Sequence, residues 1–212
     1  MSRLPLLNLE SVSFRYRAMS DPVFRDVSMT CMPGSITAIE GMNGAGKSTL
    51  LKICAGILAP SAGTVKRTGR AVYQPQGTRT LQPHLTVSEH ARLFGIALCL
   101  SGSEADDRIQ GFLDRLSPPG SIDLSHRVGE LSGGTQQKVN LAIALLDNEA
   151  DLILIDEPYA GFDSRSLAAL IDLFEQYRAE QRAVVIVNHL IDPRLNLDQV
   201  VELGDGDWDL SE

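Results

Sequence analysis

The sequence predicts an α/β fold in which a helical segment interrupts a core of buried parallel strands. Two observations support this prediction. Continuous apolar runs, typical of strands buried on both faces of a parallel sheet, occur at 152–155 and 184–187. A glycine-rich loop at 41–48 follows the β-branched segment 35–39 and precedes a helical stretch, which is the strand–loop–helix order of a phosphate-binding loop.

The N-terminal part, up to about Gly69, is rich in strands. Residues 12–16 alternate apolar and polar side chains, and residues 23–32 continue as a second half-buried strand that the Pro33-Gly34 turn closes. Residues 49–55 have helical character, and Gly56 follows them as a C-terminal cap. We therefore expect an antiparallel β region that leads into the phosphate-binding loop and its helix.

The middle section is expected to be helical. Thr86 and Glu89 have the spacing of a capping box, and Ser103 and Asp106 lie at the start of a second helix. The last third returns to α/β alternation, with a helix at 164–180 between the two apolar strands and a final strand at 200–203. We expect one domain over 1–212, whose core comprises 1–85 and 149–212 and whose helical subdomain covers about 86–148.

Composition excludes several classes of protein. The net charge of −8 argues against a surface that coats nucleic acid, and no apolar run approaches the ~18 residues of a membrane span. Residues 1–8 lack the apolar core of a secretory signal. The three cysteines, Cys31, Cys54 and Cys99, are scattered and odd in number, which favours free thiols in a reducing cytosol.

The loop at 41–48 reads G-x-x-x-x-G-K-S, the pattern that cradles the phosphates of a nucleoside triphosphate. Lys47 would place its charge against the β- and γ-phosphates, and the Ser48 hydroxyl can ligate Mg²⁺. The helix that starts there directs its N-terminal dipole at the anion. A chance glycine turn fits the flanking strand and helix less well. The nucleotide-binding residues expected here are Gly41, Asn43, Gly44, Ala45, Gly46, Lys47, Ser48 and Thr49.

Two acids, Asp156 and Glu157, end the apolar run at 152–155, at the edge of a parallel sheet where ligands bind. Asp156 would hold Mg²⁺, and Glu157 would act as general base toward the attacking water. Taken alone, the pair is equally consistent with an acidic turn. A second glycine turn, 131–138, feeds a helix and offers another N-terminus to a phosphate. One triphosphate needs only one such turn per subunit, so two subunits facing head to tail would use both.

The order of these segments resembles the nucleotide-binding domain of ATP-binding-cassette (ABC) proteins, whose signature is LSGGQ. Here Thr135 stands in place of the usual Gln. The resemblance covers essentially the whole chain and implies an ABC-type P-loop core with an N-terminal antiparallel β subdomain and an inserted α-helical subdomain. It also implies that Ser132, Gly133 and Gly134 of one subunit close over the ATP of another.

Further site residues follow from the resemblance alone. Tyr16 resembles the aromatic residue that stacks on adenine, with Phe14 as the competing candidate. Gln76 resembles the glutamine that touches Mg²⁺ and the attacking water, with Gln74 as second choice. His189 resembles the histidine at the γ-phosphate. Asp163 resembles an aspartate that reaches across the dimer, although it is also placed to cap the helix that follows.

The resemblance implies an ATPase that uses ATP and Mg²⁺ and pairs with a second nucleotide-binding subunit, identical or different. We expect the ATP-binding subunit of a transporter, at the cytoplasmic face of the membrane, attached through a separate permease subunit. The small size slightly favours export, and no nucleic-acid partner is expected. The alternatives are a soluble ABC ATPase, for example in cluster assembly, and a nucleotide-dependent scaffold. The sequence does not identify a transported substrate.

Overall fold

The computed structural model describes residues 4–17, 21–159, 161–188 and 192–204 of the 212-residue chain. The chain forms two compact units. We call residues 1–73, 150–156 and 176–212 the sheet unit, and residues 74–149 and 157–175 the helical unit. Each unit is described by itself.

The main sheet has five strands in the order β5-β6-β7-β3-β8. Strand β3 pairs in parallel with β7 and β8, and β6 pairs in parallel with β7. Strands β6 and β7 are buried along their whole length because apolar side chains point to both faces. The strands are β3 (Ile36–Gly41), β5 (Ala71–Gln74), β6 (Leu152–Asp156), β7 (Ala183–Val187) and β8 (Gln199–Leu203).

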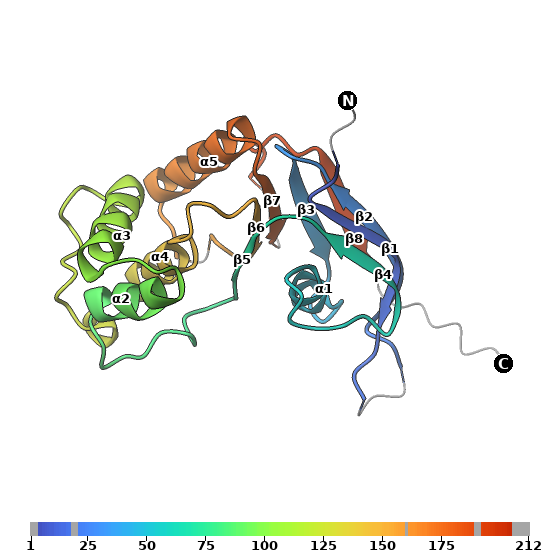
Figure 1. Ribbon diagram of the computed structural model, residues 1–212, viewed down its shortest axis with the longest axis horizontal. Coiled ribbons are helices and arrows are strands. Elements are labelled where there is room, and N and C mark those ends of the chain that lie inside the picture. The colour runs from blue at the N-terminus through green and yellow to red at the C-terminus, as the bar shows by residue number, and fades with distance from the viewer. Residues whose placement is uncertain (1–3, 18–20, 160, 189–191, 205–212) are drawn as a thin grey trace. The chain divides into compact units, whose positions relative to one another are not determined.

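A second, antiparallel sheet has the order β2-β1-β4, formed by β1 (Leu7–Phe14), β2 (Phe24–Cys31) and β4 (Ala62–Arg67). Helix α1 (Lys47–Cys54) packs against β3, β6 and β7 of the main sheet and also contacts β4 (Figure 1). Leu50 and Leu51 of α1 join the side chains of both sheets in one hydrophobic core. The predicted α/β fold is thereby confirmed, with an antiparallel β region beside a parallel sheet.

The helical unit contains α2 (Val87–Ala97), α3 (Gly102–Leu116), a short 3-10 turn (Val128–Glu130) and α4 (Gly133–Ala144). Helix α5 (Ser164–Ala179) begins in this unit and ends in the sheet unit. Apolar side chains from α2, α3 and α4, such as Val87, Ile109 and Val139, form a separate core. Among the described residues, no helix has the length and hydrophobicity needed to cross a membrane.

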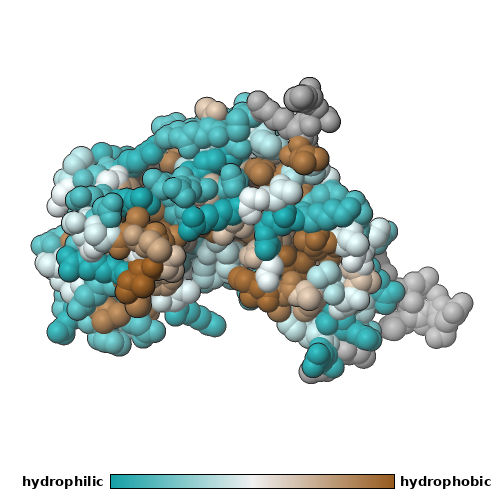
Figure 2. Space-filling view, in the orientation of Figure 1, coloured by the Kyte–Doolittle hydropathy of each residue, from teal (hydrophilic) through white to brown (hydrophobic). Residues whose placement is uncertain are grey.

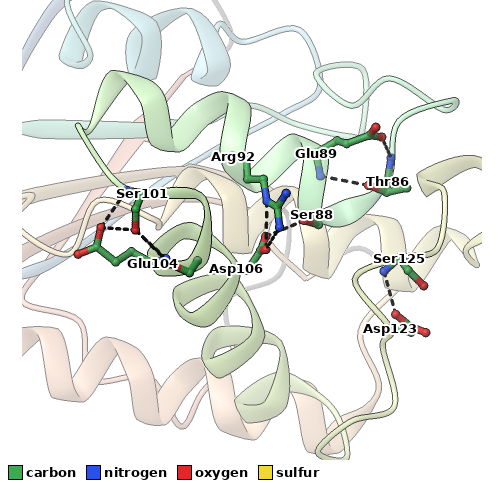
Figure 3. Close-up of polar contacts among 10 residues, drawn as sticks. Thr86, Ser88, Glu89, Arg92, Ser101, Glu104, Asp106, Asp123 and Ser125 are labelled. Carbon is green, nitrogen blue, oxygen red and sulfur yellow. Dashed lines mark hydrogen bonds and ion pairs between the residues drawn. The ribbon is translucent and has the colours of Figure 1, made fainter.

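Side-chain caps fix where the helices of this unit begin. The predicted capping box of Thr86 and Glu89 starts α2 (Figure 3). For α3 the cap is Ser101 with Glu104, two residues before the Ser103 that the sequence placed at the helix start. Asp106 has another role, because it accepts hydrogen bonds from Arg92 and Ser88 of α2 and so joins the two helices.

Candidate functional site

The phosphate-binding loop connects β3 to α1 within the sheet unit, as the sequence predicted. Gly46 has a φ of +94°, and a Cβ built there would lie 2.5 Å from Cγ1 of Val23. Only glycine fits this position, because both the backbone conformation and the close approach of Val23 exclude a side chain. The loop therefore has room for only its main chain at the helix N-terminus.

The N-terminus of α1 has no side-chain cap, whereas Thr86, Ser101 and Ser132 cap α2, α3 and α4. The amides of its first turn, including those of Ser48 and Thr49, fit an anion together with the helix dipole. Lys47 lies inside the loop, where its Nζ donates to the carbonyl oxygens of Gly41 at 2.7 Å and Met42 at 2.9 Å. This donor set suits a phosphate chain.

Tyr16 and Phe14 were the two candidates for stacking on a base. Phe14 is only 7% exposed and packs in the core of the sheet unit, whereas Tyr16 is 39% exposed. The Tyr16 hydroxyl lies 3.1 Å from Oγ1 of Thr49 in α1. The rings of Tyr16 and Phe14 meet edge to face, with their centroids 4.8 Å apart. Tyr16 is therefore the aromatic ring that is both accessible and tied to the start of α1.

Asp156 ends β6 and is buried within the sheet unit. Because β3 and β6 both run parallel to β7, the loop after β3 and the carboxylate of Asp156 belong to the same edge of the sheet. Burial, and then the negative charge of Asp156, raise the pKa of the neighbouring Tyr73 to about 12. A buried carboxylate at this edge, together with the Ser48 hydroxyl, fits a hard cation such as Mg²⁺.

Glu157 follows Asp156 in the chain and lies in the helical unit, where Gln76 Nε2 donates to its Oε2 at 2.6 Å. Glu157 has a φ of +51°, a conformation that costs free energy for a residue with a side chain and that is often kept at functional sites. Gln74, the alternative to Gln76, is 1% exposed, and its amide donates to the carbonyl oxygen of Pro75. The geometry thus pairs Gln76 with Glu157 and buries Gln74.

The second glycine turn lies at the start of α4. Ser132 is the N-cap, and its Oγ accepts a hydrogen bond from the amide of Thr135 at 3.2 Å. Ser132 and Gly133 are exposed, whereas Gly134 packs against the backbone of Gly161. The turn therefore presents a hydroxyl and a helix N-terminus to an incoming group.

Asp163 caps α5, as the sequence anticipated for one of its two roles. Its Oδ1 accepts a hydrogen bond from the amide of Ser166 at 2.8 Å, and these hydrogen bonds lower its pKa. Its Oδ2 lies 3.9 Å from Nζ of Lys138 in α4. The carboxylate therefore remains ionised near neutral pH.

His189 lies outside the described residues. Among the residues that the structure describes, no group of three or more His, Cys, Asp or Glu side chains could hold a metal. Sequence reasoning also missed two residues of α4, Gln137 and Asn140, which contact the segments that carry Glu157 and Gln76. Their only signal in the sequence is the spacing of two amides three residues apart. The structure shows that both amides are buried in α4.

Comparisons with known proteins agree with this geometry. The profile of the ABC transporter family matches residues 24–160. The macrolide export ATP-binding/permease protein MacB of Rhodopseudomonas palustris (strain BisB18) is 34% identical over 199 residues, which are 86% of this chain and 30% of that protein. The chain spans between 30% and 33% of the length of the curated relatives it matches.

Two solved structures of a related cassette also match. A dimeric bacterial ABC transporter cassette has a TM-score of 0.81 at 26% identity, covering 94% of this chain and 95% of that one. The dimer of that cassette in a post-hydrolysis state, bound to ADP and Pi, has a TM-score of 0.77 at 26% identity, covering 87% and 88%.

Proposed function

Because the chain belongs to the ABC transporter family, as an ATP-binding cassette ATPase, we propose that it powers export through a membrane-spanning permease. The observation that carries the catalytic part is the Gln76–Glu157 pair, in which a carboxylate with a left-handed backbone accepts a hydrogen bond of 2.6 Å. Such a carboxylate can take a proton from an attacking water while the glutamine orients it.

Each remaining site residue has a chemical role in this proposal. Lys47 and the first-turn amides of α1 bind the β- and γ-phosphates, and Tyr16 stacks on the base. Ser48, Asp156 and Gln76 would hold Mg²⁺. The cation would neutralise charge on the phosphate oxygens. His189 would contact the γ-phosphate.

We propose that the second half of each site comes from another subunit. Ser132 and Gly133 are exposed at the start of α4, and Ser132 already caps this helix, so the turn can meet a nucleotide held by another subunit. The related cassette is dimeric in both of its solved structures. ATP then acts as part of the interface. Hydrolysis adds charge repulsion, and release of the phosphate removes the bridge between the subunits.

The permease partner is supported by the relatives and by one surface. The MacB relatives carry an ATP-binding part and a permease part in one protein. In the helical unit, α2 exposes Leu93, Phe94 and Ile96, which are 55%, 41% and 71% accessible, and hydrophobic side chains gather over this helix (Figure 2). An exposed apolar patch of this kind marks an interaction surface. Attachment through it would place the chain at the cytoplasmic face of the membrane.

The Glu157→Gln variant tests the proposed function. This variant should bind ATP and accumulate as an ATP-dependent dimer, with turnover lowered by about 10²-fold or more because the general base is lost. Light scattering after size exclusion measures the dimer, and phosphate release measures turnover. The Glu175→Gln variant carries the same change at a half-buried position outside the site and serves as control. Near-normal turnover by Glu157→Gln would remove Glu157 from the role of base.

A further inference from the structure

We propose that Asn140 and Gln137, on the helix that begins at the second glycine turn, are positioning residues that hold Gln76 and Glu157 in register with that turn. The inference rests on the proposed function and assigns to α4 the task of joining two half-sites within one subunit. It uses only contacts inside the helical unit.

Asn140 clamps the loop around Gln76. The side chain is 3% exposed, and its Nδ2 donates to the carbonyl oxygens of Gly77 at 2.7 Å and Pro75 at 3.4 Å. Its Oδ1 accepts a hydrogen bond from Oγ1 of Thr80 at 2.6 Å. The carbonyl oxygens of Pro75 and Gly77 can only accept, and the Thr80 hydroxyl donates, so only one orientation of the Asn140 amide satisfies all three contacts. The main chain on both sides of Gln76 is thereby attached to α4.

Gln137 does the same for Glu157. It precedes Asn140 by three residues, so the two side chains leave the same face of α4. Gln137 is 3% exposed, and its Nε2 lies 3.4 Å from the carbonyl oxygen of Glu157. One helix face therefore contacts the main chain beside Gln76 and the main chain of Glu157, whose side chains meet at 2.6 Å.

The consequence concerns communication between sites. Helix α4 starts at Ser132–Gly134, which in the proposed dimer closes over the ATP of the partner subunit. Through Asn140 and Gln137, the same helix contacts the segments that carry Gln76 and Glu157, which in the proposed function act on the ATP of their own subunit. A shift of α4 on engaging the partner's ATP would move Gln76 and Glu157 together, because two buried amides connect them to the helix. This is a contiguous physical link between the two half-sites.

The test compares Asn140→Asp with wild type in the full chain. Asp keeps the acceptor for Thr80 and removes the donor to Gly77 and Pro75, at almost constant volume. We expect kcat for ATP hydrolysis to fall about 10-fold or more, since a misplaced catalytic group is costly. KM for ATP should stay within about twofold, and the ATP-dependent dimer should still form, because the phosphate-binding loop is unaffected.

Val139→Ala is the matched control, because Val139 is the buried neighbour on α4 and belongs to the apolar core. It should lower the melting temperature yet leave kcat within about twofold of wild type, which separates positioning from general loss of stability. Asn140→Ala removes the whole amide on the helix side, and Thr80→Val removes the hydroxyl on the loop side. Both variants should also lower kcat.

Two outcomes would overturn the proposal: wild-type kcat in every folded variant of Asn140 and Thr80, or a loss of kcat in Val139→Ala as large as in Asn140→Asp. The absence of ATP hydrolysis by wild type would count against the proposed function instead. The two failures are therefore distinguishable by the same assay.

Discussion

Gly134 illustrates at the residue scale how the second glycine turn depends on close packing. A Cβ at Gly134 would lie 2.5 Å from the carbonyl oxygen of Gly161, whereas a Cβ at Gly133 would meet nothing within 4 Å. The two adjacent glycines therefore differ sharply in the space around them. Gly161 itself has a φ of +76°, and a Cβ built there would lie 3.0 Å from Cα of Gly134, so position 161 also favours glycine.

We predict opposite effects of alanine at the two positions. Gly134→Ala should lower the free energy of unfolding by about 1–3 kcal/mol, because the loop of Gly161 must move. Gly133→Ala should leave it unchanged or raise it by up to ~1 kcal/mol, because alanine favours helix. Chemical denaturation of both variants measures the difference. Equal stability of the two would show that the Gly161 loop yields without cost.

Single site residues could be proposed from the sequence where they complete a recognisable pattern. Lys47 completes the G-x-x-x-x-G-K-S pattern. Glu157 was proposed because its acid pair ends an apolar strand in a chain that also has this pattern. The preference for Gln76 over Gln74 came from the family resemblance alone, and the burial of Gln74 at 1% exposure agrees with it. Asn140 was not predictable, because its role depends on a loop 60 residues away in the chain that folds against α4.

At the scale of elements, α2 and α3 are joined by Asp106, which accepts hydrogen bonds from Ser88 at 2.7 Å and from Arg92 at 2.5 Å (Figure 3). Partial burial opposes its ionisation, but the hydrogen bonds from Arg92 and Ser88 outweigh burial and lower the pKa of Asp106. A lowered pKa in the folded state means that the ionised form stabilises the fold.

We predict that Asp106→Asn lowers the free energy of unfolding at pH 7 by about 1 kcal/mol, a modest value because Arg92 is largely exposed and solvent screens the pair. The contribution is present above the ordinary Asp pKa of ~3.9 and is lost as the pH falls through the lowered pKa of the folded state. Urea denaturation of wild type and variant at several pH values measures this. Asp107→Asn, an exposed neighbour, is the control and should show a smaller difference at pH 7.

The start of α3 shows why element boundaries were harder to predict than elements. Ser101 and Ser103 are both possible caps, and the deciding feature is Glu104, which lies three residues after Ser101 and completes the capping box. The buried strands β6 and β7 were easier, because their apolar runs have a single physical interpretation. Their pairing order with β3 and β8 required the structure, since periodicity does not specify neighbours.

At the scale of the whole molecule, the proposed function gives each chain one half of each of two ATP sites. Lys47 belongs to the phosphate-binding loop of the sheet unit, and Ser132 caps the turn of the helical unit. If one subunit supplies both Lys47 and Ser132 to the same ATP, a substitution at either residue inactivates the site, and no other subunit can restore it. If the halves are shared between subunits, two different lesions can complement each other, because a head-to-tail dimer with two-fold symmetry repeats each contact.

We therefore predict that two inactive variants recover activity on mixing. Lys47→Ala lacks a phosphate-binding lysine but keeps its Ser132, and Ser132→Arg blocks its own turn but keeps its Lys47. Random pairing makes about half of the dimers mixed, and each mixed dimer has one intact site of two, so activity should reach about a quarter of wild type. Each variant alone, at the same total concentration, is the control. Two distinct affinity tags verify that mixed dimers form. Mixed dimers without ATPase activity would contradict the shared site, and activity of Ser132→Arg alone would show that one subunit suffices.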